Sequence, residues 1–78
     1  MYVTEIAPGI AVDENVRFGK PVVKGTRVAV TTVLGHLATG DTPEDIAEDY
    51  GITKDDVLAC VAYAQHVLEQ DQIRAVRR

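Results

Sequence analysis

The residues best suited to chemistry lie between positions 19 and 27, where the sequence reads G-K-P-V-V-K-G-T-R. Glycines next to a lysine and a threonine are typical of loops that bind phosphate groups. Such a loop requires a glycine, four further residues and then Gly-Lys-Ser/Thr at the start of a helix. Here Gly-Lys comes first and Gly-Thr-Arg comes last, so the spacing argues against a nucleotide site.

Two other interpretations of this segment remain open. In the first it is structural: the Thr26 hydroxyl ties a bend at Gly25, and Arg27 holds a carboxylate of the acidic middle of the chain through two hydrogen bonds. In the second, Lys20, Lys24 and Arg27 form a surface that contacts a protein partner or the DNA backbone.

Three further side chains have reactive or metal-binding chemistry: His36, Cys60 and His66. Cys60 lies on the apolar side of a predicted helix, where a free cysteine usually behaves as a small apolar residue. No cation stands at helical spacing to activate its thiol, and Cys60 and His66 do not share one helical face. A single cysteine also excludes an internal disulfide and a zinc site built from several cysteines. We therefore expect no catalytic residue, no cofactor, no metal site and no enzymatic activity.

Charge is distributed unevenly along the chain. The net charge of −4 argues against nonspecific nucleic-acid binding as the main function. Residues 41–70 contain eight acidic residues and one basic residue, Lys54, whereas residues 71–78 contain three arginines. Four acidic residues crowd one short predicted helix: Glu44, Asp45, Glu48 and Asp49. Two of them could hold a divalent ion, but a solvated face explains them more simply, and that face could bind a basic surface of a partner protein.

The acidic residues belong to two predicted helices, joined by a tight turn, over residues 42–62. Thr42, followed by proline at the first helical position, and Thr53 are both expected to be N-caps. Gly51 ends the first helix because glycine adopts left-handed backbone angles cheaply. The small Ala47 allows a close crossing, and Val57 packs back on it. This spacing predicts a helix-turn-helix.

Two more helical features are predicted around this unit. The second helix should continue to about residue 69, with an apolar core face at positions 57, 58, 61, 64, 67 and 68. Before the unit, Thr31 or Thr32 should cap a helix that Gly40 stops. Gly35 inside that helix lowers its intrinsic stability by about 1 kcal/mol relative to alanine, which suggests that it allows close packing.

The first thirty residues have β character. Residues 2–12 predict a hairpin with Pro8 and Gly9 at its turn, and residues 22–23 and 28–30 are short extended pieces. A lone hairpin is marginal in water, so it needs a third strand, the helices or a second copy of the protein. We favour the second copy, that is, a homodimer formed through the N-terminal β arm.

The second helix of the unit has few side chains suited to recognising a DNA sequence. Its first turns offer Lys54 and Thr53 to phosphates, but its acids repel them and Leu58 cannot hydrogen-bond to a base edge. A DNA-binding form would therefore be a dimer that uses basic residues from the whole chain: Lys20, Lys24, Arg27, Lys54, Arg74, Arg77 and Arg78.

Two segments together are distinctive: G-K-P-V-V-K-G-T-R-V-A-V at 19–30 and T-P-E-D-I-A-E-D-Y-G-I-T-K-D-D-V-L-A-C-V-A-Y-A at 42–64. They resemble the small prokaryotic family catalogued as domain of unknown function 433, over about residues 10–66. The resemblance implies a homeodomain-like three-helix unit with a short β arm. It also implies an antitoxin paired with a small, PIN-related, nuclease-like toxin. The family offers no established catalytic residues, and its matching positions are Gly19, Pro21, Gly25, Thr26 and Arg27 in the signature and Glu44, Ile46, Ala47 and Tyr50 in the helices.

The sequence thus predicts one mainly α domain with a small β arm. Its parts are the arm and signature (1–30), a three-helix unit (31–70) and a basic tail (71–78). The resemblance implies an antitoxin-type interaction module. We expect it to be cytoplasmic, because no signal peptide or membrane-length apolar run is present. The alternatives are a small dimeric DNA-binding transcription regulator and a purely structural dimer.

Overall fold

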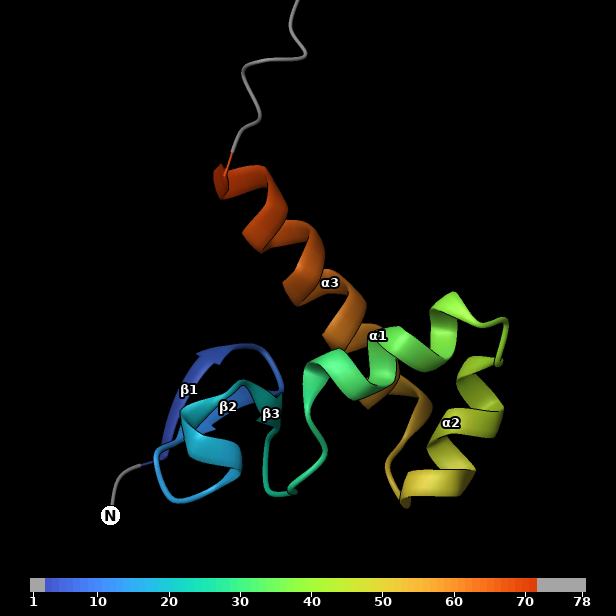
Figure 1. The fold of residues 1–78 in the computed structure, drawn as a ribbon, viewed down its shortest axis with the longest axis horizontal. Coiled ribbons are helices and arrows are strands. Elements are labelled where there is room, and N and C mark those ends of the chain that lie inside the picture. The colour runs from blue at the N-terminus through green and yellow to red at the C-terminus, as the bar shows by residue number, and fades with distance from the viewer. Residues whose placement is uncertain (1–2, 72–78) are drawn as a thin grey trace, which may run out of the picture.

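The computed structural model describes residues 3–71 and places a three-stranded antiparallel sheet before three helices (Figure 1). The elements are β1 (Val3–Ala7), β2 (Ile10–Asp13), a 3-10 turn η1 (Arg17–Gly19), β3 (Val22–Val23), α1 (Val30–Ala38), α2 (Pro43–Tyr50) and α3 (Lys54–Asp71). This architecture confirms the predicted mainly α chain with a small β arm. The predicted basic tail lies outside the described residues, except for Asp71.

The predicted hairpin is confirmed, and its third strand comes from the same chain. β2 pairs with β1 on one side and with β3 on the other, where Ile10 faces Val23 and Ala11 faces Val22. The hairpin is thus supported without a second copy, and dimerisation stays a prediction. Gly9 in the turn has a φ of +78°, and a Cβ added to it would lie 3.3 Å from the Cβ of Ala59. The hairpin turn therefore rests directly on α3.

The core is built from small aliphatic side chains of β2, β3 and all three helices. The largest fully buried side chains are Ile10, Val23, Val33, Ile46, Val57 and Cys60. The predicted apolar role of Cys60 is confirmed, since its side chain is fully buried. Burial, together with the nearby carboxylate of Asp56, raises the pKa of this thiol to about 11.

The helix-turn-helix forms through the predicted capping residues. Thr42 Oγ1 accepts a hydrogen bond from the N–H of Asp45 at 3.1 Å. Thr53 and Asp56 exchange two bonds, of 3.0 and 2.9 Å, in a reciprocal capping box. Gly51 takes a φ of +68°, and both its N–H and that of the next residue donate to the carbonyl of Ala47.

The predicted threonine cap of α1 is wrong. The N-cap residue is Ala29, and its side chain makes no capping hydrogen bond. The sheet fixes the start of the helix instead. Ala29 forms a β-bridge with Val22, and the N–H of Val30 donates to the carbonyl of Pro21 at 3.0 Å. Helix α1 therefore begins where the extended chain leaves the sheet.

The predicted packing role of Gly35 is also wrong. A Cβ at this position would meet no atom within 4 Å. The residue borders a shallow hollow on α1, together with Thr31, Thr32 and Thr39. Within the described part of the chain, nothing packs closely enough against this turn to require glycine.

Most of the predicted core face of α3 is not buried, so that prediction is largely wrong. Val57 and Cys60 reach the core, but Leu58, Val61 and Leu68 are exposed, the last to 65%. The reason is visible in Figure 1, where α3 passes the sheet and α1 and then extends beyond them. The apolar residues on its outer turns, Val67 and Leu68, therefore stay exposed.

His36 fastens α1 to α2. Its Nδ1 lies 2.7 Å from Asp41 Oδ2, and its Nε2 lies 2.8 Å from the hydroxyl of Tyr50. The two rings also meet edge to face, with centroids 5.3 Å apart. Tyr50 sits at the exposed edge of α2 and makes its contact through its hydroxyl.

The turn η1 has an unusual backbone. Arg17 and Phe18 have φ values of +53° and +57°, and Gly19 follows at +80°. Two hydrogen bonds of 3.1 Å close the turn, from Gly19 N–H to Val16 and from Lys20 N–H to Arg17. Left-handed angles cost roughly 1–2 kcal/mol for each residue with a side chain. The Phe18 side chain is 98% exposed, so burial does not offset that cost.

We expect Phe18→Gly to raise the free energy of unfolding by about 0.5–1 kcal/mol. Relief of the left-handed strain outweighs the extra freedom that glycine gives the unfolded chain. Urea unfolding followed by circular dichroism measures the change. The matched control is Lys20→Gly, because Lys20 is also exposed but has a φ of −72°. That control should lose stability, and a loss in Phe18→Gly as well would contradict the strain argument.

We expect Gly35→Ala to stabilise the protein by about 1 kcal/mol, since the new methyl group meets open space inside a helix. Gly51→Ala is the opposing control. It also meets open space, but a φ of +68° is unfavourable for alanine, so it should destabilise. Thermal unfolding of the two variants side by side tests the pair. Equal effects of the two substitutions would show that helix propensity and backbone angle do not determine the change in stability at these positions.

Cys60 should make stability depend on alkaline pH. Below pH 9 the thiol is protonated in both the folded and the unfolded protein, so its contribution to the free energy of unfolding has its full value there. Between pH 9 and about 11 the unfolded thiol ionises while the folded one stays neutral, and the free energy of unfolding should fall by about 1–3 kcal/mol. Cys60→Ala is the control, because other groups titrate in the same range. If the difference between the two proteins stays constant with pH, the assignment is wrong.

Candidate functional site

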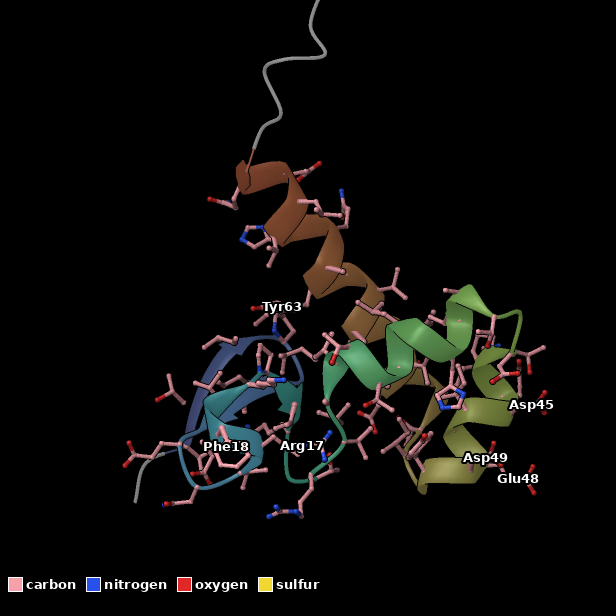
Figure 2. All side chains as sticks on the ribbon, viewed as in Figure 1. Arg17, Phe18, Asp45, Glu48, Asp49 and Tyr63 are labelled. Atoms are coloured by element: carbon pink, nitrogen blue, oxygen red, sulfur yellow. The ribbon has the colours of Figure 1, made fainter. Side chains whose placement is uncertain are left out.

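The charged residues form two separate surfaces. Figure 2 shows the Arg17–Phe18 turn beside the sheet and the acidic side chains of α2 on the opposite side of the molecule. Because these surfaces lie apart, each can serve a different contact.

The acidic surface consists of three exposed carboxylates on α2, namely Asp45, Glu48 and Asp49. The fourth predicted partner-binding residue, Glu44, is also exposed but has a partner. Its Oε2 lies 2.9 Å from Lys54 Nζ, a contact that lowers the pKa of Glu44 and raises that of Lys54. This pair links the N-termini of α2 and α3. The three other carboxylates make no ion pair within residues 3–71, and they remain free to meet a basic surface.

Two of the predicted DNA-binding residues are neutralised by carboxylates. Lys54 pairs with Glu44, and Lys24 Nζ lies 2.9 Å from Glu5 Oε1. Glu5 also accepts the N–H of Gly9, and these two contacts, the backbone bond first, lower its pKa. Lys24 thus braces the hairpin. The structure does not bring the predicted cations together as one set, and Arg74, Arg77 and Arg78 lie outside the described residues.

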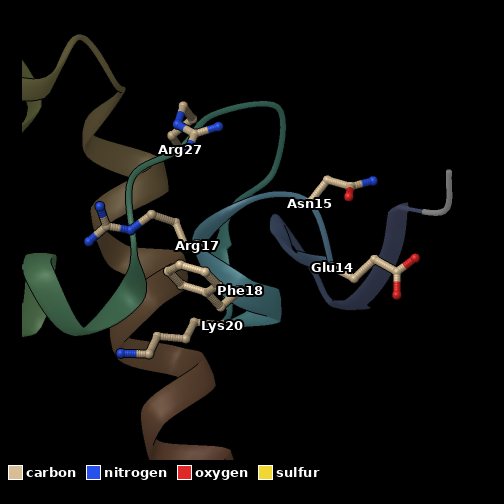
Figure 3. A pocket seen from close by; sticks show the side chains of 6 residues that line it. All are labelled: Glu14, Asn15, Arg17, Phe18, Lys20 and Arg27. Atoms are coloured by element: carbon tan, nitrogen blue, oxygen red, sulfur yellow. The ribbon is translucent and has the colours of Figure 1, made fainter.

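The two remaining predicted DNA-binding residues of the described chain, Lys20 and Arg27, lie close together. They line one hollow of about 580 Å³ with a third cation, Arg17, and with Phe18. In Figure 3 the Phe18 ring is drawn between the side chains of Arg17 and Lys20, which point the same way. The remaining lining residues are Glu14 and Asn15, which point away from them. The hollow therefore joins three cations and one exposed ring.

Arg27 does not hold a carboxylate of the acidic middle, so that prediction is wrong. No residue of the described chain forms an ion pair with it, because α2 lies across the molecule. The bend needs no such support. Thr26 Oγ1 donates to the carbonyl of Val23 at 2.8 Å and accepts the N–H of Val28 at 2.9 Å. The predicted role of Thr26 in tying the bend is confirmed.

The sequence did not single out Arg17 or Phe18. Two consecutive left-handed residues that are not glycine have no recognisable local pattern. The available signal was a phenylalanine within the mostly polar segment D-E-N-V-R-F-G.

A third surface is apolar and surrounds Tyr63 on α3. On one side a hollow of about 360 Å³ reaches the hairpin at Ile6 and Pro8. On the other, a hollow of about 380 Å³ reaches Leu34 on α1 and Leu68 near the end of α3. This surface offers the apolar area that a protein interface requires.

The other reactive side chains form no site in the described part of the chain. His66 Nε2 lies 3.4 Å from Gln70 Nε2 and does not meet Cys60, which is buried. Within residues 3–71 no three histidine, cysteine or acidic residues are grouped so that they could bind a metal ion. None of the described helices has the length and apolar character needed to span a membrane.

Known proteins are similar to this chain in sequence and in fold. A family described as "Protein of unknown function (DUF433)" matches residues 10–64. A Mycobacterium tuberculosis protein described as "Putative antitoxin VapB45" is 40% identical over 56 residues, which cover 68% of this chain and 23% of that protein. The crystal structure of Rv2018 from M. tuberculosis matches with a TM-score of 0.62 and 36% identity, over 67% of this chain and 24% of that one. The chain spans about a quarter of each relative, and it belongs to the DUF433 family.

Proposed function

We propose that this protein is an antitoxin-type interaction module that binds and neutralises a small nuclease-like toxin. The observation that carries the proposal is the 40% identity to a protein described as a putative antitoxin. An inhibitor of this kind acts by covering a surface, so it needs no catalytic group of its own.

Two surfaces support this function physically. A nuclease that grips RNA presents a basic groove, and Asp45, Glu48 and Asp49 on α2 offer the complementary charge. The apolar surface around Tyr63 and the outer turns of α3 supplies area that can lose its contact with water. Charge would speed association, and apolar burial would slow dissociation.

The alternative, a small dimeric DNA-binding regulator, has support from the helix-turn-helix itself. The N-terminus of α3 weakens that support, because Asp55 and Asp56 stand in its first turn and Lys54 is held by Glu44. For the dimer, the outer edge of β1 has no strand beside it within the described sheet, and Val3 and Ile6 are exposed there. A second copy could add a strand at that edge.

The charge-reversal variant Glu48→Lys/Asp49→Lys tests the proposed mechanism. The toxin is first identified as a stoichiometric small protein, encoded beside this one, that co-purifies from the native host. We expect the variant to bind that toxin at least tenfold more weakly, because like charges would then face each other. Binding by calorimetry and residual ribonuclease activity are the two measurements.

The control variant is Glu14→Lys, compared with Glu48→Lys alone, because both make the same change in net charge and Glu14 lies on neither α2 nor α3. It should bind and inhibit normally. If both variants bind like the unmodified protein, the acidic surface is not the contact. If no protein co-purifies, or if the neighbouring protein keeps full nuclease activity in the complex, the antitoxin function itself is refuted.

A further inference from the structure

The cations that are free of ion pairs in the described chain converge on one place. Residues 3–71 contain five basic residues: Arg17, Lys20, Lys24, Arg27 and Lys54. Carboxylates neutralise two of them, Lys24 and Lys54, and the other three all line the hollow beside Phe18. In a protein with a net charge of −4, such a local excess of positive charge is suited to attract an anion.

The aromatic ring at the same place is not explained by folding. Phe18 is 98% exposed, and the left-handed angles of Arg17 and Phe18 hold the ring out from the surface. Folding alone would favour glycine in such a turn and would bury an apolar side chain. Backbone strain of this kind is concentrated at ligand sites, where it fixes the contacting groups in place.

We propose that this turn binds an unpaired single strand of nucleic acid. The Phe18 ring stacks on one base, since every base has a flat π face and an exposed aromatic side chain is the usual platform for it. Arg17 and Lys20, on the two sides of the ring, bind the flanking phosphates, Arg17 with paired N–H groups, and Arg27 adds a third positive charge. Figure 3 shows the arrangement that this requires, with the ring between two cationic side chains.

The lining of the hollow favours a single strand over other ligands. In a duplex the bases are already stacked on each other, so the ring would find no free face. A protein anchor of this type is normally surrounded by apolar contacts that exclude water. Here the other five lining residues are charged or polar: Glu14, Asn15, Arg17, Lys20 and Arg27. A simple anion would use the cations but would leave the ring without a role.

The site is independent of the proposed toxin contact, because the acidic carboxylates of α2 lie across the molecule (Figure 2). Those carboxylates repel the rest of a long strand, so binding should be short-ranged and weak. With three phosphates neutralised, log K should fall with log[salt] with a slope of roughly −2.

The test uses the full-length chain at low salt with ten-nucleotide probes that carry one 2-aminopurine, whose fluorescence changes when it stacks. The probes are oligo-dT, oligo-U and a matched duplex. We expect saturable binding of the single strands, at least tenfold tighter than that of the duplex. The comparison of dT with U decides whether DNA or RNA is preferred.

Variants separate stacking from charge. Phe18→Leu should weaken binding roughly tenfold and remove the fluorescence change without altering the salt slope, while Phe18→Tyr should retain both. Arg17→Gln or Arg27→Gln should reduce the slope by roughly 0.7. Lys54→Gln removes one positive charge at the start of α3, away from the hollow. It should change neither the affinity for the probe nor the salt slope.

Three results would overturn the proposal. One is equal binding by Phe18→Leu and the unmodified protein. Another is equal weakening by Lys54→Gln and Arg27→Gln, which would indicate diffuse electrostatic attraction. The third is full displacement of the probe by a polyglutamate peptide at equal charge, which would assign the site to acidic proteins. None of these results bears on the α2 variants, so either proposal can fail alone.

Discussion

The structure depends on a short set of backbone bonds that close residues 21–30 on themselves. Val23 N–H donates to Val28, and Val30 N–H donates to Pro21, with the Thr26 hydroxyl bridging the bend between them. This closure gives the hairpin its third strand and sets the first residue of α1. It also brings Lys20, which precedes the segment, and Arg27, which lies inside it, to the same side as the η1 turn. The Gly-Lys-Pro to Gly-Thr-Arg signature is thus a structural unit first, and two of its three cations, Lys20 and Arg27, are left free for contact as a consequence.

Local features of the fold were predictable from sequence, and features that depend on distant parts of the chain were not. Thr42, Thr53 and Gly51 act within three or four residues of themselves, so their roles could be inferred from spacing alone. The start of α1 depends on a bridge to Val22, and the exposure of Leu68 depends on where the globule ends. Neither property is present in a helical pattern.

The candidate sites likewise contain some features that the sequence reveals and others that only the tertiary fold reveals. The carboxylates of α2 were identified correctly as an exposed cluster, because charge and helical spacing are visible in the sequence. The ion pairs of Lys24 and Lys54 remove two of the predicted basic contacts, and such pairs require the tertiary fold. The Arg17–Phe18 turn could not be inferred, since backbone angles that a sequence disfavours have no positive signature. The separation of the acidic and basic surfaces likewise appears only when α1 is placed between them.

The contact between Gly9 and Ala59 limits how this sequence can diverge. A side chain at position 9 would be strained by the positive φ, and its Cβ would already crowd Ala59 at 3.3 Å. A branched residue at position 59 would push the hairpin turn away from α3 from the other direction. The two positions, fifty residues apart, are therefore constrained as a pair, and small residues should persist at both even where the surfaces around them have adapted to different partners.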